Sequence, residues 1–514
     1  MVIKQGNCWV KRAVIHAAVA ALLIAIVLIA TITIAIDIST KNKPVQPFYV
    51  GVTFGGDNIA DAKQLIDKVK DYTNLFVIQS GPLMYDLDAT EEICDYAITA
   101  GLNIILSYTH NSRGSLDKIL NIAQTRWSNN FLGIYYNDEP GGKMLDTSNT
   151  LFDTNRSIHK NHEDKSIQFS ISTNSTWTFI RYTMSGTITI ETILQANIEP
   201  FWEKIRPVDG NIADSVPLAS ESVFVNATVY YPNGTICYTT RDASRIDRTL
   251  TYHPDGSVRD ETGQSVKDQG NISQFQTYQE IYSSLPIQTY SDIADLYIKN
   301  QQNNLDLFDS SSSPVRLFTS DYALYWWDYQ VGYDVVFAQL GWNNSVAQEV
   351  GLVRGAANLL GKSWGTIITW TYTQPPYLIS GEEMYSQMCA SYEAGAEYVV
   401  VFNYAQDMAG AFGTLQDEHF LALEHFWTDV AQNDGVVHGG VSAEAVLVLP
   451  KDYGWGMRSP EDNIWGLWNA DDTSRQIWIQ LQNKLEQYGL KLDIVFDDPI
   501  YDVTKKYNQI YYWN

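Results

Sequence analysis

The chain has 514 residues, of which 45% are hydrophobic and 18% are charged, a composition typical of a globular protein with a large core. Its net charge of −25 argues against a nucleic-acid-binding function, because phosphate binding needs clustered Lys and Arg. Fifteen Trp and 32 Tyr supply flat apolar faces, which suit a core or the faces of sugar rings.

The first predicted element is a membrane-spanning helix over residues 13–36. This run contains only one His and two Thr as polar residues, and about 20 apolar residues are enough to cross a bilayer. Three basic residues and no acidic residue precede it, so the positive-inside rule predicts a cytoplasmic segment 1–12 and an extracellular remainder. A cleaved signal peptide is the alternative, although its apolar region is normally shorter. Residues 37–47 form a linker.

Six Asn-x-Ser/Thr sequences follow this run, and each is a possible glycan acceptor on an extracellular chain. They lie at Asn155, Asn174, Asn226, Asn233, Asn271 and Asn343.

Segments typical of strands and helices alternate from residue 48 to 144. The predicted strands cover 48–54, 75–78, 102–108 and 131–136. The predicted helices between them cover 59–72, 90–100 and 116–127. This alternation predicts βαβ units and a parallel sheet.

A β-rich insertion is predicted over residues 145–288, where the alternation stops. Short β-like runs at 167–172, 224–231 and 235–240 are separated by turn signals such as Pro232-Asn233-Gly234. Because the insertion follows the fourth strand, we expect it on the same barrel face as the carboxylates that follow that strand.

Alternation resumes over residues 289–434. Four further strands are predicted at 315–319, 334–340, 365–370 and 398–402. Helices are predicted at 290–308, 348–360, 384–394 and 418–431. Four strands before the insertion and four after it make eight, the number that closes a (β/α)8 TIM barrel.

Residues 435–514 are predicted to form a small C-terminal α/β subdomain. Its strands are expected at 445–449, 492–495 and 509–512, with a helix at 475–488. No activity is assigned to it.

The chemistry of a parallel barrel lies at the carboxyl ends of its strands. Asn137, Asp138 and Glu139 directly follow the fourth predicted strand, although either acid can instead cap the following turn. A ring of polar and aromatic residues, which suits a saccharide, follows the other strands. The predicted substrate-binding residues are His110, Asn137, Trp326, Gln339, Trp342, Trp370, Tyr372 and Asn403. The alternative for Trp326 is a place in the core, and the alternative for His110 is a structural role.

The sequence Asn137-Asp138-Glu139-Pro140 resembles the Asn-Glu-Pro motif of the large retaining glycoside hydrolase clan built on (β/α)8 barrels. This resemblance implies that Glu139 is the acid/base, with the extra Asp138 leaving the two acids interchangeable. The chain from the fifth to the eighth strand also resembles membrane-anchored prokaryotic barrel proteins that have not been characterised. The resemblance covers most of residues 48–432.

The chain departs from the clan at the seventh strand, where the clan carries its nucleophilic Glu. No carboxylate ends this strand here, and Gln339 at the sixth strand is an amide. Asp321, after the fifth strand, is the best remaining second carboxylate, with Asp138 as the other choice. We expect Glu139 and Asp321 to face one cleft within about 10 Å, the outer limit for an inverting pair. The alternative for Asp321 is the N-cap of a helix that starts at Tyr322.

Two functions follow from this pattern. The first is a membrane-anchored, extracellular glycoside hydrolase that acts on a polysaccharide or glycan, and the second is a non-catalytic surface protein that binds carbohydrate on the same barrel. No cofactor is predicted. Cys94, Cys237 and Cys389 form no CxxC motif and no His/Cys pair at zinc spacing, so no metal site is predicted either.

Overall fold

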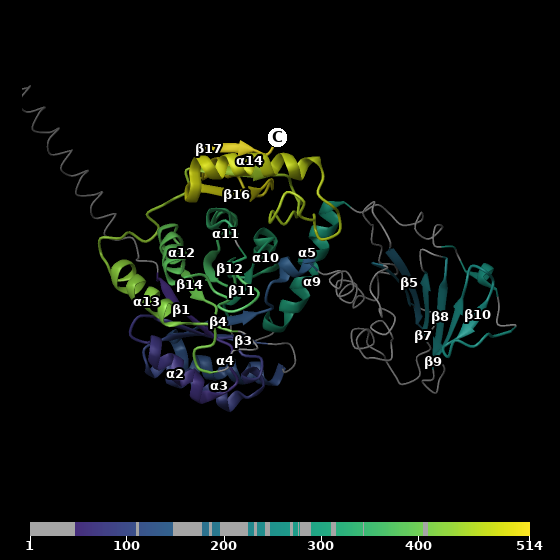
Figure 1. The fold of residues 1–514 in the computed structure, drawn as a ribbon, viewed down its shortest axis with the longest axis horizontal. Coiled ribbons are helices and arrows are strands. Elements are labelled where there is room, and N and C mark those ends of the chain that lie inside the picture. Colours follow the sequence, from purple (N-terminus) through teal and green to yellow (C-terminus); the bar gives the residue numbers. More distant parts are fainter. Residues whose placement is uncertain are drawn as a thin grey trace, which may run out of the picture. The chain divides into compact units, whose positions relative to one another are not determined.

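The computed structural model describes residues 47–108, 113–146, 177–184, 188–195, 225–230, 234–241, 247–267, 271–275, 277, 289–309, 315–342, 344–404 and 410–514. Its centre is a closed barrel of eight parallel strands that follow one another around the ring in chain order (Figure 1). They are β1 (Tyr49–Phe54), β2 (Leu75–Ile78), β3 (Asn103–Tyr108), β4 (Phe131–Tyr136), β11 (Leu317–Asp321), β12 (Val335–Leu340), β13 (Ser363–Ile368) and β14 (Tyr398–Val401). The predicted (β/α)8 barrel is therefore confirmed.

Helices follow the strands of this barrel. They are α2 (Ile59–Val69), α3 (Leu87–Thr99), α4 (Arg113–Ile122), α5 (Pro140–Asp146), α9 (Tyr290–Asp309), α10 (Tyr325–Val331), α11 (Val346–Leu360), α12 (Gly381–Glu393) and α13 (Asp417–Phe426). Side-chain caps fix several helix starts. Asn58 accepts a hydrogen bond from the Asp61 amide in α2, and Ser380 accepts one from the Glu383 amide in α12.

Large apolar side chains fill the barrel interior. The buried cluster consists of Leu75, Val77, Ile105, Tyr135, Phe318, Val335, Phe337, Ile367, Tyr398 and Val400. The Arg316 guanidinium, which precedes β11, donates to the Glu397 carboxylate at 2.9 Å and to the Tyr398 hydroxyl at 2.6 Å. Because the interior is packed, the barrel is not a pore, and a ligand can only bind at an end of it.

The predicted insertion contains a six-stranded antiparallel sheet in the order β10-β9-β8-β7-β5-β6. Its strands are β5 (Trp177–Met184), β6 (Ile188–Gln195), β7 (Val225–Tyr230), β8 (Ile236–Arg241), β9 (Asp247–Tyr252) and β10 (Val258–Asp260). The expected hairpin pairs β7 with β8, with Tyr230 opposite Ile236. The run predicted at 167–172 lies outside the described residues.

The C-terminal piece is a three-stranded parallel sheet that packs on the barrel helix α11. β15 (Ala445–Leu449) lies between β16 (Leu492–Phe496) and β17 (Gln509–Tyr512), and α14 (Asp472–Tyr488) contacts β15 and β16. Gly355 of α11 allows a close approach, since a Cβ there would lie 2.8 Å from the Ile494 carbonyl oxygen. The C-terminal piece is thus a small α/β unit that lies against the barrel.

A buried ion pair joins α11 to this C-terminal sheet. The Arg354 Nε lies 2.7 Å from the Asp493 Oδ1, and these side chains are 4% and 0% exposed. Arg354 also donates to the carbonyl oxygen of Leu490 at 2.6 Å. The arginine therefore satisfies a carboxylate that has no access to solvent.

We expect Arg354→Met to lower the free energy of unfolding by about 3–5 kcal/mol, because it leaves the Asp493 carboxylate buried without its cation. Urea unfolding of the full chain measures this loss. Arg475→Met is the matched control, since Arg475 pairs with Asp472 at the exposed surface, where such a pair contributes at most about 1 kcal/mol. Equal stability of the two variants would contradict the assigned role of Arg354.

The predicted membrane-spanning helix over 13–36 lies outside the described residues. Within the part of the chain that the structure describes, none of the helices combines the length and the apolar character needed to cross a bilayer.

Candidate functional site

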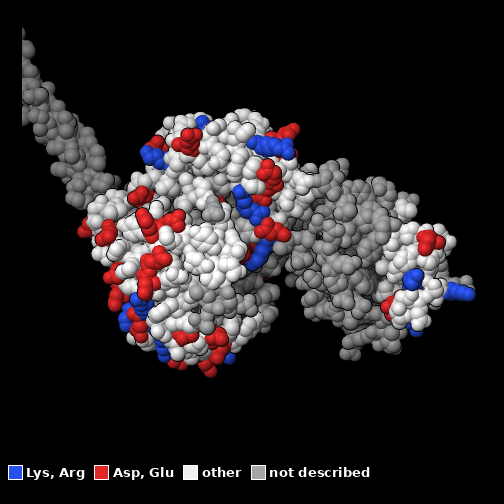
Figure 2. Space-filling view, in the orientation of Figure 1, with Lys and Arg blue, Asp and Glu red and all other residues white. Residues whose placement is uncertain are grey.

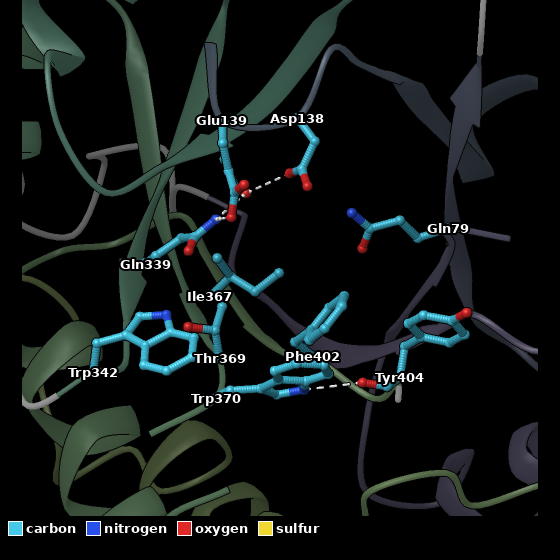
Figure 3. A pocket seen from close by; sticks show the side chains of 11 residues that line it. Gln79, Asp138, Glu139, Gln339, Trp342, Ile367, Thr369, Trp370, Phe402 and Tyr404 are labelled. Carbon is cyan, nitrogen blue, oxygen red and sulfur yellow. Dashed lines mark hydrogen bonds between the residues drawn. The ribbon is translucent and has the colours of Figure 1, made fainter. Parts of the chain in front are cut away.

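A pocket of about 250 Å³ opens at the carboxyl ends of the barrel strands (Figure 3). The residues that line it come from the ends of β2, β4, β11, β12, β13 and β14 and from the segments that follow them. They are Gln79, Asp138, Glu139, Ser320, Gln339, Trp342, Ile367, Thr369, Trp370, Phe402 and Tyr404. The pocket therefore lies where the sequence predicted the site.

Glu139 is held in an unusual backbone conformation at the end of β4. Its φ is 56°, and Asn137, two residues before it, has a φ of 54°. A left-handed conformation is rare for residues other than Gly and costs on the order of 1 kcal/mol or more. The Glu139 amide donates to the Ser320 carbonyl oxygen at 2.9 Å, which fixes this turn against β11. Strained turns of this kind cluster at functional sites.

Asp321 does not face the pocket with Glu139, contrary to the sequence-based expectation. Its carboxylate is fully buried and accepts hydrogen bonds from the amides of Gly141 at 2.5 Å and Gly142 at 2.8 Å, in the first turn of α5. The amides of Tyr322 and Ala323 donate to the same carboxylate. With its oxygens bound to backbone, Asp321 positions the segment that follows Glu139 and is not available as a nucleophile.

Hydrogen bonds also hold the C-terminal end of α5 in place. Asp146 accepts hydrogen bonds from Arg458 at 2.7 Å and from the Tyr322 hydroxyl at 2.6 Å. Arg458 belongs to the C-terminal piece and forms a second ion pair there, with Asp462. The C-terminal piece therefore contributes to holding α5, the helix that directly follows the two acids.

Asp138 and Glu139 are connected by a chain of hydrogen bonds. The Gln339 Nε2 donates to the Glu139 Oε1 at 2.8 Å and to the Ser320 Oγ at 3.0 Å. The Ser320 hydroxyl donates in turn to the Asp138 Oδ1 at 3.0 Å. The Tyr135 hydroxyl, at the top of the packed core, also donates to that Asp138 oxygen. Both carboxyl groups are thus fixed in position by side chains from β4, β11 and β12.

The electrostatic environment favours the protonated form of Glu139. Burial raises the pKa of its carboxyl group, and the neighbouring Asp138 charge raises it further. The hydrogen bond from Gln339 and the Lys143 ammonium oppose this effect, and Lys143 lies 3.9 Å from the carboxylate. A carboxyl group with a raised pKa can hold a proton closer to neutral pH and donate it to a bound ligand.

Aromatic side chains form the wall across from the two acids, as Figure 3 shows. Trp370 donates from its indole nitrogen to the Tyr404 carbonyl oxygen at 2.9 Å and packs against Tyr377 in a tilted arrangement, with ring centroids 4.7 Å apart. Trp342 and Tyr404 are 47% and 40% exposed, so their faces are open at the rim. A pocket with carboxylates on one side and aromatic faces on the other suits a ligand with hydroxyl groups and an apolar face.

Two polar atoms in the pocket are buried and have no hydrogen-bond partner within the described residues. They are the Gln79 Oε1 and the Thr369 Oγ1. Buried polar atoms in folded proteins are nearly always paired, so each is a candidate contact for a ligand. The amide oxygen accepts a hydrogen bond, whereas the threonine hydroxyl can donate or accept one.

The other predicted binding residues divide into two groups. Gln339, Trp342 and Trp370 line the pocket as expected, whereas Tyr372 is exposed and is not part of the lining. His110 lies outside the described residues.

Three predicted residues have structural positions instead. Asn403 is buried and accepts a hydrogen bond from the Thr414 amide at 2.9 Å, and Asn137 donates to Gln301 of α9 at 2.8 Å. Trp326 is buried on α10 between Phe496 and Tyr501 of the C-terminal piece, with ring centroids 6.1 and 5.6 Å away. Trp326, Asn137 and Asn403 are therefore not among the residues that line the pocket, and Trp326 has the core position that was the alternative for it.

Sequence reasoning missed Ser320, Ile367, Thr369 and Phe402 as pocket residues. The available signal was the alternation of side chains along a strand, since residues two apart point to the same face. Phe318 and Phe337 are in the packed interior, so Ser320 and Gln339, two positions further along, continue the same inward row to the mouth.

Within the described residues, no cluster of three or more His, Cys, Asp or Glu side chains is arranged to hold a metal ion. Cys94, Cys237 and Cys389 are free thiols. The polar groups of the pocket are therefore carboxylates, amides and hydroxyls.

No protein-family model matches the chain, and a search of curated proteins finds no match to it. The barrel itself hosts many unrelated activities, so the assignment of a function depends on the chemistry of the pocket.

Proposed function

We propose that this protein is a membrane-anchored, extracellular glycoside hydrolase that acts on a polysaccharide or glycan. The observation that carries the proposal is the position of the Glu139 carboxyl group, which lies in the pocket beside Asp138 and across from an aromatic wall. Burial and the Asp138 charge both raise its pKa, as is typical of a general acid that protonates a leaving oxygen.

In this proposal Glu139 is the acid/base and Asp138 is the second carboxylate. Gln339 and Ser320 orient both groups through bonds of 2.8–3.0 Å. Trp342, Trp370 and Tyr404 supply faces for the sugar ring. Thr369 and Gln79 offer buried polar atoms to its hydroxyl groups.

A hydrolysis screen of the full chain tests the proposal. A panel of aryl glycosides and oligosaccharides is incubated with the protein, and the released phenol or reducing sugar is measured. We expect release from at least one member. On an oligosaccharide or a glycoside of a weakly acidic phenol, this release should be lost in Glu139→Gln and retained in Glu382→Gln, whose side chain is exposed at the start of α12. Equal release by the Glu139 variant from these substrates with poor leaving groups would contradict the assignment of the acid.

The second candidate function is carbohydrate binding without hydrolysis. It is favoured by the end of β13, where the pocket residues Thr369 and Trp370 replace the carboxylate that the glycosidase clan carries. Under this alternative a glycan array gives binding that Glu139→Gln leaves intact, and the hydrolysis screen gives no release from any member.

The membrane location and the carbohydrate partner are part of the same proposal. On the face drawn in Figure 2, Lys and Arg are interspersed with Asp and Glu, and the chain carries a net charge of −25, which disfavours nucleic acid as a partner. An uncleaved anchor over 13–36 leaves the barrel outside the cell.

We expect the full chain to sediment with membranes, to be released only by detergent, and to be digested by protease added to intact cells. A full chain that stays in the soluble fraction, or that protease reaches only after lysis, would contradict the topology.

A further inference from the structure

The two pocket acids lie on one side of the pocket. They are consecutive residues, and Gln339 and Ser320 bridge their carboxyl groups in steps of 2.8, 3.0 and 3.0 Å. Figure 3 shows both groups entering from the end of β4, with Trp370 and Phe402 across the pocket. The following inference rests on the proposed function, and it concerns the kind of sugar that this arrangement can cleave.

The position of both carboxyl groups on one side of the pocket does not fit the usual mechanisms of glycoside hydrolysis. Those mechanisms place the two carboxyl groups on either side of the scissile bond, so that one protonates the leaving oxygen and the other acts from the opposite face. The described pocket residues on the far side, Ile367, Thr369, Trp370 and Phe402, have no carboxyl group. Asp321 is fully engaged by backbone amides. Among the residues that the structure describes, none is left to act as the nucleophile, so the remaining source is the substrate itself, which is a known exception to the two-carboxylate rule.

We propose that the substrate is a β-linked 2-acetamido-2-deoxy sugar whose own acetamido group is the nucleophile. Asp138 accepts a hydrogen bond from the acetamido N–H and turns the carbonyl oxygen toward the anomeric carbon. Tyr135 and Ser320 hold Asp138 in position for this contact. The side chains of Ile367 and Phe402 provide an apolar surface for the acetamido methyl group.

The reaction has two steps. In the first, the acetamido oxygen bonds to the anomeric carbon while the bond to the leaving oxygen breaks, and Glu139 gives its proton to that oxygen. The resulting bicyclic cation is stabilised by the Asp138 carboxylate. In the second, water bonds to the anomeric carbon and gives a proton to Glu139, and the bond to the acetamido oxygen breaks. The products are the leaving alcohol and a sugar with the original anomeric configuration, so no further reactant is needed.

A substrate series on the full chain tests this inference. Aryl β-glycosides of one sugar are compared with a 2-hydroxyl, a 2-acetamido, and a mono-, di- or trifluoroacetamido group. We expect hydrolysis of the acetamido sugar with retained configuration by NMR. The rate should fall with each added fluorine, by at least about tenfold for the trifluoro compound, because fluorine weakens the carbonyl oxygen as a nucleophile.

Asp138→Asn keeps an oxygen that can accept from Tyr135 and Ser320 but loses the charge. We expect it to lower kcat on the acetamido sugar by about 100-fold, in line with the loss of one preorganised electrostatic contact. It should also weaken inhibition by a thiazoline analogue of the bicyclic intermediate. Circular dichroism and thermal melting of this variant show whether the loss of kcat arises in a correctly folded protein.

Three results would overturn the inference and leave the hydrolase proposal in place. They are equal rates on the 2-hydroxyl and 2-acetamido sugars, an inverted product, and rates that do not respond to fluorine. If none of these glycosides is cleaved and the thiazoline does not bind, the inference fails, and the wider panel of aryl glycosides and oligosaccharides decides the hydrolase proposal.

Discussion

Replacing Glu139 by Gln is expected to lower kcat by about 10²- to 10⁴-fold on a glycoside with a poor leaving group, which is the usual contribution of a positioned acid. The variant keeps the size of the side chain and an oxygen that can accept from Gln339, a bond of 2.8 Å in the wild type. It has no acidic proton to donate. KM should change little, because the aromatic faces and the buried polar atoms of the pocket remain.

A leaving-group series distinguishes lost acid catalysis from a damaged pocket. Aryl glycosides with acidic phenols need little protonation, so phenol release by the variant in the first turnover should approach the wild-type rate on them and fall behind as the phenol becomes less acidic. Glu382→Gln should match the wild type throughout. A uniform loss across the series would instead point to altered binding, and an unchanged rate on the least acidic phenol would refute the role of Glu139.

The barrel was predictable because its signals are local. The bounds predicted for β2 and β4 agree with the structure, since both are short apolar runs bounded by turn residues. The place of the site followed from a general rule about strand ends. That rule identified Glu139, Asp138, Gln339, Trp342 and Trp370 without knowledge of any contact.

The errors concern residues whose role is decided by distant parts of the chain. Asp321 looked like a catalytic acid because it ends a strand, but its partners are the amides of Gly141 and Gly142 on another barrel unit. Trp326 could be a sugar platform or a core residue, and it is Phe496 of the C-terminal sheet that covers it. A single sequence contains no local signal that separates an exposed tryptophan on a helix from one buried by a later domain.

Stability should fall as the pH rises from about 4 to about 8, because of three buried carboxyl groups, those of Asp321, Asp328 and Glu349. Burial raises the pKa of Asp321 to about 7 and that of Glu349 to about 8, and it raises the pKa of Asp328 well above its ordinary value. Tyr325 donates to Glu349 at 2.5 Å and Tyr297 donates to Asp328 at 2.6 Å, which opposes the shifts without removing them.

The direction of this pH dependence follows from the numbers of protons that the folded and unfolded states bind. The unfolded carboxyl groups have pKa values of about 4, so between about pH 4 and 8 the folded state binds more protons than the unfolded state. The free energy of unfolding then decreases with pH over this window. One group shifted by three pKa units contributes a change of about 4 kcal/mol. The pKa values of the exposed acids Asp67, Asp255 and Asp502 are lowered, so these groups change the free energy of unfolding only at a pH below this window.

Thermal unfolding of the full chain at pH 5 and pH 8 measures this effect, and we expect the higher midpoint at pH 5. Glu349→Gln cannot ionise and keeps an oxygen for Tyr325, so its stability should depend less on pH and exceed that of the wild type at pH 8. Glu444→Gln, at an exposed pair with Lys491, should follow the wild type. A midpoint that is constant or rises between pH 5 and 8 would mean that these groups are ionised in the folded protein. In that case Asp321 would hold the Glu139 segment as a carboxylate at every pH of interest.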